Sequence, residues 1–257
     1  MRPIVTLLTD FGLSDSNVAE MKAAILSEGT DIRLVDISHL VPPGDIRAAQ
    51  YLLRRSWPRF PVGTVHVVVV DPGVGSGRRA VAVRHQGHFF VGPDNGVFTP
   101  VLDGAEVVEL RIPREASPTF HGRDVFAPAA ARLAEGEPFQ VLGPAVAAPV
   151  RVAPPEPRRQ EGGVDGEVIY VDRFGTLISN IPGAWVEGAP AIEVAGRPIG
   201  PLRRTFADVE TGSPVAFIGS DGLLEVAVRD GSARERLHAG VGAAVRAHLA
   251  GVEGLRS

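Results

Sequence analysis

The residues Thr64-Val65-His66-Val67-Val68-Val69-Val70-Asp71 decide the fold of this chain. The run from Thr64 to Val70 is almost entirely β-branched, which is typical of a strand that is buried on both faces. Strands of this kind lie inside parallel sheets that helices cover on both sides. We therefore expect residues 64–70 to form the centre of a sheet, with Asp71 at the carboxyl end of the strand.

Short apolar runs alternate with helical patterns around this strand, which is typical of a parallel sheet covered by helices. Further strands are predicted at residues 4–8 and 32–37, a hairpin-like pair at 80–85 and 88–91, and helices after Ser14-Asp15-Ser16, over 45–55 and from Asp124 to Leu133. The sequence therefore predicts an α/β fold whose N-terminal domain is a parallel-sheet, Rossmann-like domain.

The composition changes near residue 150, where four prolines fall within residues 148–157. Proline lacks the amide donor that helices and central strands need. Short β-rich runs then follow at 166–172, 176–181, 191–194, 214–219 and 223–228. We expect an α/β catalytic domain at 1–150, a proline-rich linker at 151–165 and a smaller antiparallel β-barrel domain at 166–257.

The chain has 257 residues, of which 44% are hydrophobic and 22% are charged, so it can build a sizeable core. Its formal net charge of -4 gives no general attraction for nucleic acid. It contains no cysteine, which excludes disulfides, thiolate catalysis and cysteine-ligated metal sites. No apolar run is long enough to span a membrane, and we expect a cytoplasmic protein.

Three of the predicted strands end in an aspartate, namely Asp10, Asp36 and Asp71. The carboxyl ends of parallel strands face the ligand crevice, so these acids are candidates for one site. Each of them can also simply cap the following turn, and this is the interpretation that we favour for Asp36. Asp10 is followed by Phe11-Gly12, a pattern suited to binding a ribose diol.

A glycine-rich stretch, Pro72-Gly73-Val74-Gly75-Ser76-Gly77, separates Asp71 from Arg78. It matches neither the dinucleotide-binding pattern nor a P-loop. The carboxylate and the guanidinium can meet across the loop as a charge-assisted pair. Spacing alone leaves open whether that pair serves a ligand site or only stiffens the loop.

Three further residues have a structural interpretation beside a functional one. His121 precedes a predicted helix, where a histidine usually caps or packs. Asn95 lies in an Asn-Gly pair, which is a strong turn signal. Phe174 lies in a polar turn between two strands, and its functional role would be to stack on adenine.

Six segments taken together resemble the SAM hydroxide adenosyltransferases, also called adenosine-forming SAM hydrolases, which are relatives of the fluorinases. The segments are TDFG, DISH, VVDPGVGSGRR, VGPDNGVF, FHGRDVFAP and VDRFGTLISNI, in this order over most of the chain. The resemblance implies an N-terminal α/β domain, a C-terminal β-barrel, and a homotrimer with active sites between the first domain of one subunit and the second domain of its neighbour.

By this resemblance, the catalytic set of the family corresponds to Asp71, Arg78 and His121, and its ribose-binding aspartate to Asp10. The substrate-binding set that we expect also includes Phe11, Asn95, Phe120, Asp172, Phe174, Asn180, Phe206, Ser220 and Asp221. In the halogenating relatives an aromatic residue and a tyrosine stand where this chain has Asp71 and His121. That difference favours water over halide as the nucleophile.

The implied reaction is attack of water at the ribose C5′ of S-adenosylmethionine, which releases adenosine and methionine. The sulfonium makes methionine a good leaving group, so the enzyme must mainly align and partly desolvate the water. Arg78 would favour hydroxide, while Asp71 and His121 would orient it and accept the proton. The sequence leaves open which of the two accepts it. No metal or cofactor is expected, since SAM is the substrate.

Three other functions remain open at this stage. The acids Asp10, Asp36 and Asp71 can hold a divalent metal for phosphoester hydrolysis, although Arg78 would compete with a cation beside Asp71. A SAM-dependent halogenase is the nearest alternative, and a SAM or adenosine sensor without turnover is the third.

Overall fold

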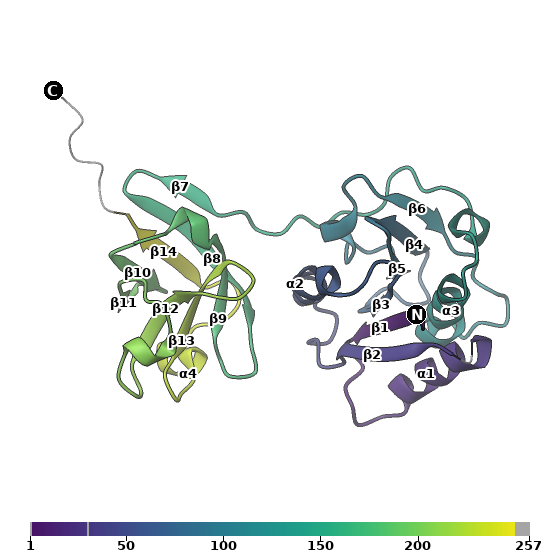
Figure 1. Cartoon of the computed structure of the whole chain (residues 1–257), viewed down its shortest axis with the longest axis horizontal. Helices are drawn as coiled ribbons and strands as arrows, with labels where there is room; N and C mark the ends of the chain where they lie inside the picture. Colours follow the sequence, from purple (N-terminus) through teal and green to yellow (C-terminus); the bar gives the residue numbers. More distant parts are fainter. Residues whose placement is uncertain (1, 30, 250–257) are drawn as a thin grey trace. The chain divides into compact units, whose positions relative to one another are not determined.

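The computed structural model describes residues 2–29 and 31–249 (Figure 1). The chain divides between Ala153 and Pro154 into two compact units, which are treated separately below. The sequence predicted a first domain at 1–150, a linker at 151–165 and a barrel domain at 166–257. The last eight residues of that predicted barrel lie outside the described residues.

In the described part of the first unit, six strands form one sheet in the order β2-β1-β3-β5-β4-β6. Their bounds are β1 Ile4–Thr9, β2 Arg33–Ser38, β3 Val65–Val69, β4 Ala80–His85, β5 His88–Pro93 and β6 Glu106–Glu109. As predicted from its β-branched run, β3 lies inside the sheet and is buried throughout.

The sheet is mixed, so the prediction of a parallel sheet is wrong at one side. Strands β2, β1, β3 and β5 run parallel, but β4 is antiparallel to both β5 and β6. The reversal follows from the hairpin turn Gln86-Gly87, whose two residues both have positive φ values of 47° and 78°. Such a turn joins adjacent antiparallel strands directly.

The helices of the first unit are α1 Asn17–Glu28, α2 Ile46–Ser56 and α3 Ala127–Ala134, with a π-helical turn at Gly122–Phe126 before α3. Figure 1 shows α1 and α3 on one side of the sheet and α2 on the other. Asp45 caps α2 as a helix-starting residue should, by accepting a hydrogen bond from Ala48 N. The predicted cap at Asp124 is wrong, because Asp124 lies inside the π-helical turn and its carboxylate accepts a hydrogen bond from Ser117 N.

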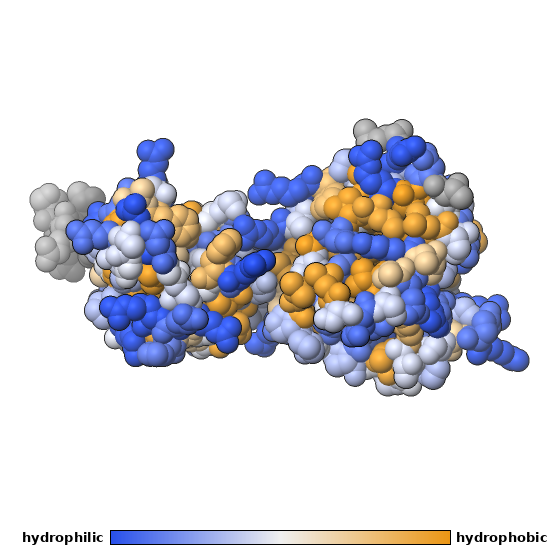
Figure 2. Space-filling model, turned by 90° about the horizontal axis from the view of Figure 1, so that it is seen from below, coloured by the Kyte–Doolittle hydropathy of each residue, from blue (hydrophilic) through white to orange (hydrophobic). Residues whose placement is uncertain are grey.

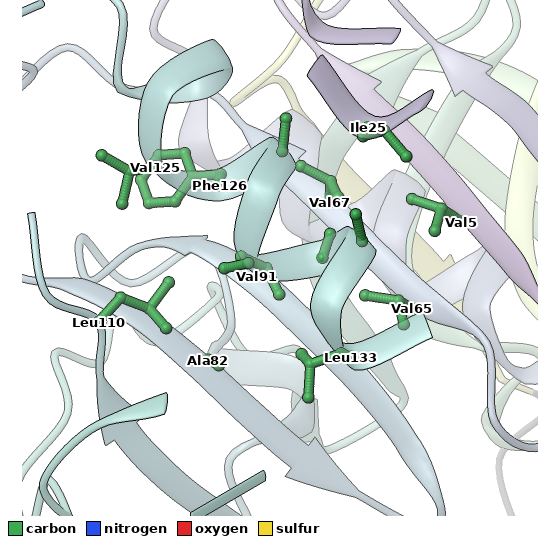
Figure 3. Close-up of a cluster of buried hydrophobic side chains, with 14 of the residues drawn as sticks. Val5, Ile25, Val65, Val67, Ala82, Val91, Leu110, Val125, Phe126 and Leu133 are labelled. Carbon is green, nitrogen blue, oxygen red and sulfur yellow. The ribbon is translucent and has the colours of Figure 1, made fainter. Parts of the chain in front are cut away.

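Alternate side chains of the central strands form the core beneath α1 and α3 (Figure 3). Val5, Val65 and Val67 are fully buried there, against Ile25 of α1 and Phe126 at the start of α3. Leu26, the residue after Ile25 on α1, is 43% exposed. Burial of these apolar side chains holds β1 and β3 rigidly, and both strands end at the same edge of the sheet.

The second unit is a barrel-like antiparallel sheet. Its described strands follow the order β11-β10-β14-β8-β9-β13-β12, with β7 paired to β8, and β11 also contacts β12 at the far end of this order. The bounds are β7 Arg158–Gln160, β8 Gly163–Val171, β9 Leu177–Pro182, β10 Ala191–Val194, β11 Arg197–Gly200, β12 Pro214–Ile218, β13 Leu223–Val228, β14 Ala244–His248 and helix α4 Ala233–Leu237.

Two strands of the second unit have the bounds expected from sequence, β10 and β13. By contrast, β7 and the start of β8 fall within the segment that we expected to be a linker. Residues 151–157 of the predicted linker, which include three of the prolines, have no regular structure.

The face of the molecule in Figure 2 carries apolar patches among hydrophilic residues. Large hydrophobic side chains at the surface include Leu13, Val62 and Phe174. No helix in the described ranges is long and apolar enough to cross a membrane.

Candidate active site

The loop between β3 and β4 carries the predicted catalytic aspartate and arginine. Asp71 O accepts a hydrogen bond from Val74 N at 3.3 Å, and Gly73 O accepts one from Ser76 N at 3.1 Å, so the loop folds into successive tight turns. Gly75 has a φ of +75°, and a Cβ at this position would lie 2.7 Å from Pro118 O. Glycine is therefore required for the loop to pack against the segment that leads to His121.

Asp71, Arg78 and His121 form one connected cluster. The Arg78 guanidinium donates from Nε to Asp71 Oδ1 at 3.0 Å and from Nη2 to Asp71 Oδ2, and Nη2 also lies 2.9 Å from His121 Nδ1. The Asp71 and Arg78 side chains are only 5% and 9% exposed. Phe126 covers the guanidinium, with its ring centroid 5.3 Å from Cζ. A buried two-pronged pair of this kind holds both side chains in a fixed geometry.

The contact with Arg78 determines where His121 carries its proton. Burial, followed by the positive charge of Arg78, lowers the pKa of His121, so the ring is neutral near pH 7. An arginine can only donate hydrogen bonds, so His121 Nδ1 accepts from Nη2. The neutral ring therefore carries its proton on Nε2, which is a donor in this arrangement.

Asp10 lies at the end of β1, and its carboxylate is held near the catalytic loop. Its Oδ2 accepts a hydrogen bond from Gly44 N at 2.8 Å. A Cβ on Gly44 would lie 3.7 Å from the Pro72 Cβ, so Gly44 stands between Asp10 and the residue after Asp71. Oδ1 of Asp10 has no hydrogen-bond partner within residues 2–29 and 31–249. It is therefore available to a ligand hydroxyl.

Phe11 and Phe120 pack edge to face, with ring centroids 5.7 Å apart. Gly122 fits closely beneath both rings, since a Cβ there would lie 3.3 Å from Phe11 Cζ and 3.3 Å from Phe120 Cε2. The predicted residues Asp10-Phe11 and Phe120-His121 are thus brought together, although more than 100 positions separate them in the sequence.

Asn95 uses its amide within the fold. Its Nδ2 donates to Val70 O at 2.8 Å, and its Oδ1 accepts from Val97 N at 3.2 Å. Asn95 therefore supports the end of the strand that carries Asp71. These contacts support the structural interpretation of the Asn-Gly turn.

Sequence reasoning missed a second buried ion pair beside the first. Arg79 Nε donates to Asp94 Oδ2 at 2.8 Å, and Asp94 Oδ1 accepts from Val150 N at 2.7 Å. The Asp94 side chain is only 4% exposed. The adjacent arginines Arg78 and Arg79 thus bind separate aspartates, and the second pair fixes the end of the loop. The paired Arg78-Arg79 and the Asp94-Asn95 turn were the available signals.

The three strand-end acids have different partners. Asp71 binds Arg78, Asp10 binds Gly44 N, and Asp36 accepts a hydrogen bond from Lys22 Nζ at 2.7 Å. In the described part of the chain, no group of three or more histidine, aspartate or glutamate side chains is arranged to hold a metal ion. The geometry gives no support to the metal-dependent phosphoesterase alternative.

In the second unit, three of the predicted residues line one pocket of about 730 Å³, namely Asp172, Phe174 and Phe206. Phe174 is 77% exposed, and Phe206 is 45% exposed and packs on Phe217. Asp172 Oδ1 accepts hydrogen bonds from Phe174 N and Thr176 N at 2.9 and 2.8 Å, so it shapes the turn that presents Phe174.

The remaining predicted residues of this unit lie elsewhere. Asn180, on β9, accepts a hydrogen bond from Glu167 N and donates to Pro155 O, both at 2.9 Å, so its amide is used within the fold. Ser220 and Asp221 lie in the turn between β12 and β13. Both carboxylate oxygens of Asp221 are buried and have no hydrogen-bond partner among the described residues. A buried carboxylate without a partner is costly, which makes Asp221 a candidate for a cationic ligand group.

Comparisons with known proteins match both units. The family model for the SAM hydroxide adenosyltransferase N-terminal domain matches residues 5–143, and that for the C-terminal domain matches residues 166–246. An (R)-S-adenosyl-L-methionine hydrolase of Thermus thermophilus is 46% identical over 96% of this chain and 99% of its own length. A fluorinase of Actinoplanes is 31% identical over 88% of this chain and 90% of its own length.

Two solved structures also match this chain over almost its whole length. A crystal structure of an uncharacterized conserved protein from Thermotoga maritima is 34% identical, has a TM-score of 0.90, and covers 95% of this chain and 100% of its own. A conserved hypothetical protein from Thermus thermophilus is 45% identical with a TM-score of 0.80, over 96% of this chain and 100% of its own.

Proposed function

The chain belongs to the SAM hydroxide adenosyltransferase family, and we propose that it hydrolyses S-adenosyl-L-methionine to adenosine and L-methionine. The family membership predicted from the six sequence segments is confirmed by these matches. The observation that carries the proposal is the buried cluster of Asp71, Arg78 and His121, in a chain 46% identical to an (R)-S-adenosyl-L-methionine hydrolase.

The proposed chemistry is a single displacement at the ribose C5′. The oxygen of a water molecule forms a bond to C5′ while the C5′–S bond breaks. The electron pair of the C5′–S bond stays on sulfur, which becomes the thioether of methionine. Water loses one proton in the reaction. Because free water, with a pKa of about 15.7, is a weak nucleophile, the site must orient it and favour hydroxide character.

The geometry narrows the choice of proton acceptor that the sequence left open. His121 Nδ1 is occupied by Arg78, and Nε2 carries the ring proton, so His121 serves as a donor that orients the water or a substrate oxygen. The single lone pair of His121 Nδ1 is used by Arg78, whereas each carboxylate oxygen of Asp71 has a second lone pair that can accept a proton. Arg78 supplies the positive charge that favours hydroxide. We therefore assign the proton to Asp71.

Substrate recognition is shared between the two units in this proposal. The available Oδ1 of Asp10 would accept hydrogen bonds from the ribose diol, beside Phe11 and Phe120. Phe174 and Phe206 would stack on or cover adenine, as base stacking on exposed aromatic side chains does elsewhere. The unpartnered carboxylate of Asp221 would bind the methionine ammonium.

We propose that the reaction needs no cofactor and no metal. The test is chromatography of metal-stripped protein incubated with SAM, with and without chloride or fluoride. Adenosine and methionine in equal amounts without halide support the hydrolase. A 5′-halogenated nucleoside would assign a halogenase instead, and SAM bound but unchanged would assign a sensor.

We further propose a homotrimer in which each active site combines the first unit of one subunit with the second unit of its neighbour, as the family resemblance implies. Mixing two inactive variants tests this arrangement, one altered at Asp71 and one at Phe174 and Phe206 together. Random assembly of subunits would restore about a quarter of the sites if they are shared between subunits. No recovery after subunit exchange would place each site within one chain.

Two finer assignments complete the proposal. We propose that the first unit acts as a Rossmann-like domain, since β1 and β3 deliver Asp10 and Asp71 to the carboxyl edge of parallel strands, where ligands bind in such sheets. We also propose a cytoplasmic location, with which a cysteine-free sequence is compatible. Cell fractionation with an antibody against the protein tests that location.

A further inference from the structure

Strand β1 carries two buried threonines that each bind a buried histidine. Thr6 Oγ1 lies 2.8 Å from His66 Nδ1, and Thr9 Oγ1 lies 2.9 Å from His39 Nδ1. All four side chains are almost completely buried, His39 being the most exposed of them at 4%. The two pairs are chemically alike, but they differ in what surrounds them.

The pair of Thr9 and His39 encloses the turn that carries Asp10. Gly12 N donates to His39 O at 2.7 Å, and Phe11 N donates to Thr9 Oγ1 at 3.3 Å. His39 therefore binds the residue before Asp10 through its ring and the second residue after Asp10 through its carbonyl. Gly12 has a φ of +74°, which lets the chain turn between these two contacts.

The other side of the His39 ring is held by Asp36. Its Oδ1 lies 3.2 Å from His39 Nε2, which is ion-pair range but outside hydrogen-bond geometry, and its Oδ2 accepts a hydrogen bond from Lys22 Nζ at 2.7 Å. A carboxylate next to Nε2 favours the proton on that nitrogen and leaves Nδ1 as an acceptor. The Thr9 hydroxyl then donates to Nδ1 and accepts from Phe11 N, so the contacts that lead from His39 Nδ1 to the Asp10 turn have consistent donor and acceptor roles.

Asp36 remains a carboxylate in this environment. Burial raises its pKa, but the interactions with Lys22 and His39 outweigh that effect, and the pKa lies below its usual value. The DISH segment, which contains Asp36 and His39, thus supports the Asp10 turn from behind.

We infer that His39, held by Asp36 and acting through Thr9, is a positioning residue that fixes the Asp10 turn for recognition of the ribose diol. The inference rests on the proposed function, since it takes Asp10 as the group that binds the ribose. Removal of the Thr9 contact frees the turn, so that Asp10 Oδ1 no longer meets the diol in one geometry. Binding of adenine and the chemistry at Asp71 are not directly affected.

Two variants of the same strand test the inference, Thr9→Val and Thr6→Val. Each keeps the side-chain shape, removes one hydroxyl and leaves one buried histidine Nδ1 without its threonine. Thr6→Val is therefore the matched control, because Thr6 and His66 have no contact with the Asp10 turn among the described residues. Melting temperatures of both variants show whether their losses of stability are comparable. His39→Ala is the second variant at the site.

The measurement is calorimetric binding of adenosine and of 2′-deoxyadenosine. Wild type is expected to prefer adenosine by about 10- to 100-fold, as loss of one charge-assisted hydrogen bond implies. Thr9→Val and His39→Ala are expected to reduce that preference to less than about 3-fold, while Thr6→Val keeps it.

Retention of the full preference in Thr9→Val and His39→Ala, or an equal loss in Thr6→Val, would overturn the inference while the proposed function stands. If wild type binds neither nucleoside, the proposed function fails, and the inference fails with it.

Discussion

The two units present their candidate site residues in opposite ways. In the first unit, Asp71 and Arg78 are 5% and 9% exposed and bind each other, and Arg78 also binds His121. In the second unit, Phe174 and Phe206 are 77% and 45% exposed on the rim of a pocket. Groups that take part in a reaction must be in a fixed geometry before the substrate binds. Exposed aromatic rings, by contrast, form most of their contacts only when a ligand is bound. The difference supports the proposal that the first unit supplies the chemistry and the second unit supplies affinity.

The largest effect is expected from Asp71→Asn, which keeps the shape of the side chain and removes its charge. Without the carboxylate, the proton acceptor is lost and Arg78 has no charged partner, so kcat for SAM hydrolysis should fall about 10³-fold with little change in KM. Steady-state kinetics on SAM measures both constants.

The neighbouring ion pair provides the control for this change. Asp94→Asn breaks the contact with Arg79. The Asp94 side chain is as buried as that of Asp71, but Asp94 does not contact the catalytic cluster directly. Its kcat should fall less than about 10-fold. Equal losses of kcat in the two variants would mean that stiffness of the loop, rather than the Asp71 carboxylate, determines the rate.

Phe174→Ala, in the second unit, is expected to have an intermediate effect, and to change KM for SAM where Asp71→Asn changes kcat. Loss of a stacked aromatic ring should raise KM for SAM about 30-fold and leave kcat within about 2-fold. Val241→Ala, which changes another exposed apolar side chain of this unit, serves as the control and should leave both constants unchanged. A fall in kcat without a change in KM would contradict the division of roles between the units.

The smallest effect concerns acid stability, which should be a property of the first unit. Burial, and then the nearby His88, lower the pKa of His66 to about 3. Folded His66 is therefore neutral, while the unfolded chain takes up a proton below about pH 6.5. The stability from this residue is complete above pH 6.5 and is lost as the pH falls toward 3. Between pH 7 and 5.5 the loss is roughly 1 kcal/mol.

Urea unfolding can follow the two units separately, because the chain has two tryptophans, Trp57 in the first unit and Trp185 in the second. In the Trp185→Phe variant, the fluorescence of Trp57 reports unfolding of the first unit. In the Trp57→Phe variant, the fluorescence of Trp185 reports unfolding of the second unit. His66→Gln, which keeps a polar group opposite Thr6, should remove this part of the pH dependence. An unchanged slope in that variant would assign the acid sensitivity to other groups.

Much of the fold followed from local patterns. The β-branched run at 64–70 became the buried strand β3, and the alternating runs at 191–194 and 223–228 became β10 and β13. The hairpin-like pair predicted at 80–85 and 88–91 became β4 and β5, which are antiparallel, but strand β6 beside β4 was not predicted. The π-helical turn before α3 was missed, since Asp124 looks like an ordinary cap in the sequence.

One contact of the candidate site could be predicted from the sequence, and the others could not. Asp71 and Arg78 were expected to pair from their spacing across a glycine loop, and they do. The contact between Arg78 and His121 joins residues 43 positions apart and depends on the close approach of Gly75 to Pro118, which no local pattern encodes. Residues that only support others, such as Asp94 and His39, carry no chemical pattern of their own.

The most direct test of the central claim is hydrolysis of SAM by metal-stripped protein in water enriched in oxygen-18, with mass spectrometry of both products. If the cluster of the first unit delivers water to C5′, each adenosine will carry one labelled oxygen at its 5′ position, and methionine will carry none. Unlabelled adenosine, label in methionine, or SAM that remains intact would contradict the assignment of Asp71, Arg78 and His121 to this reaction.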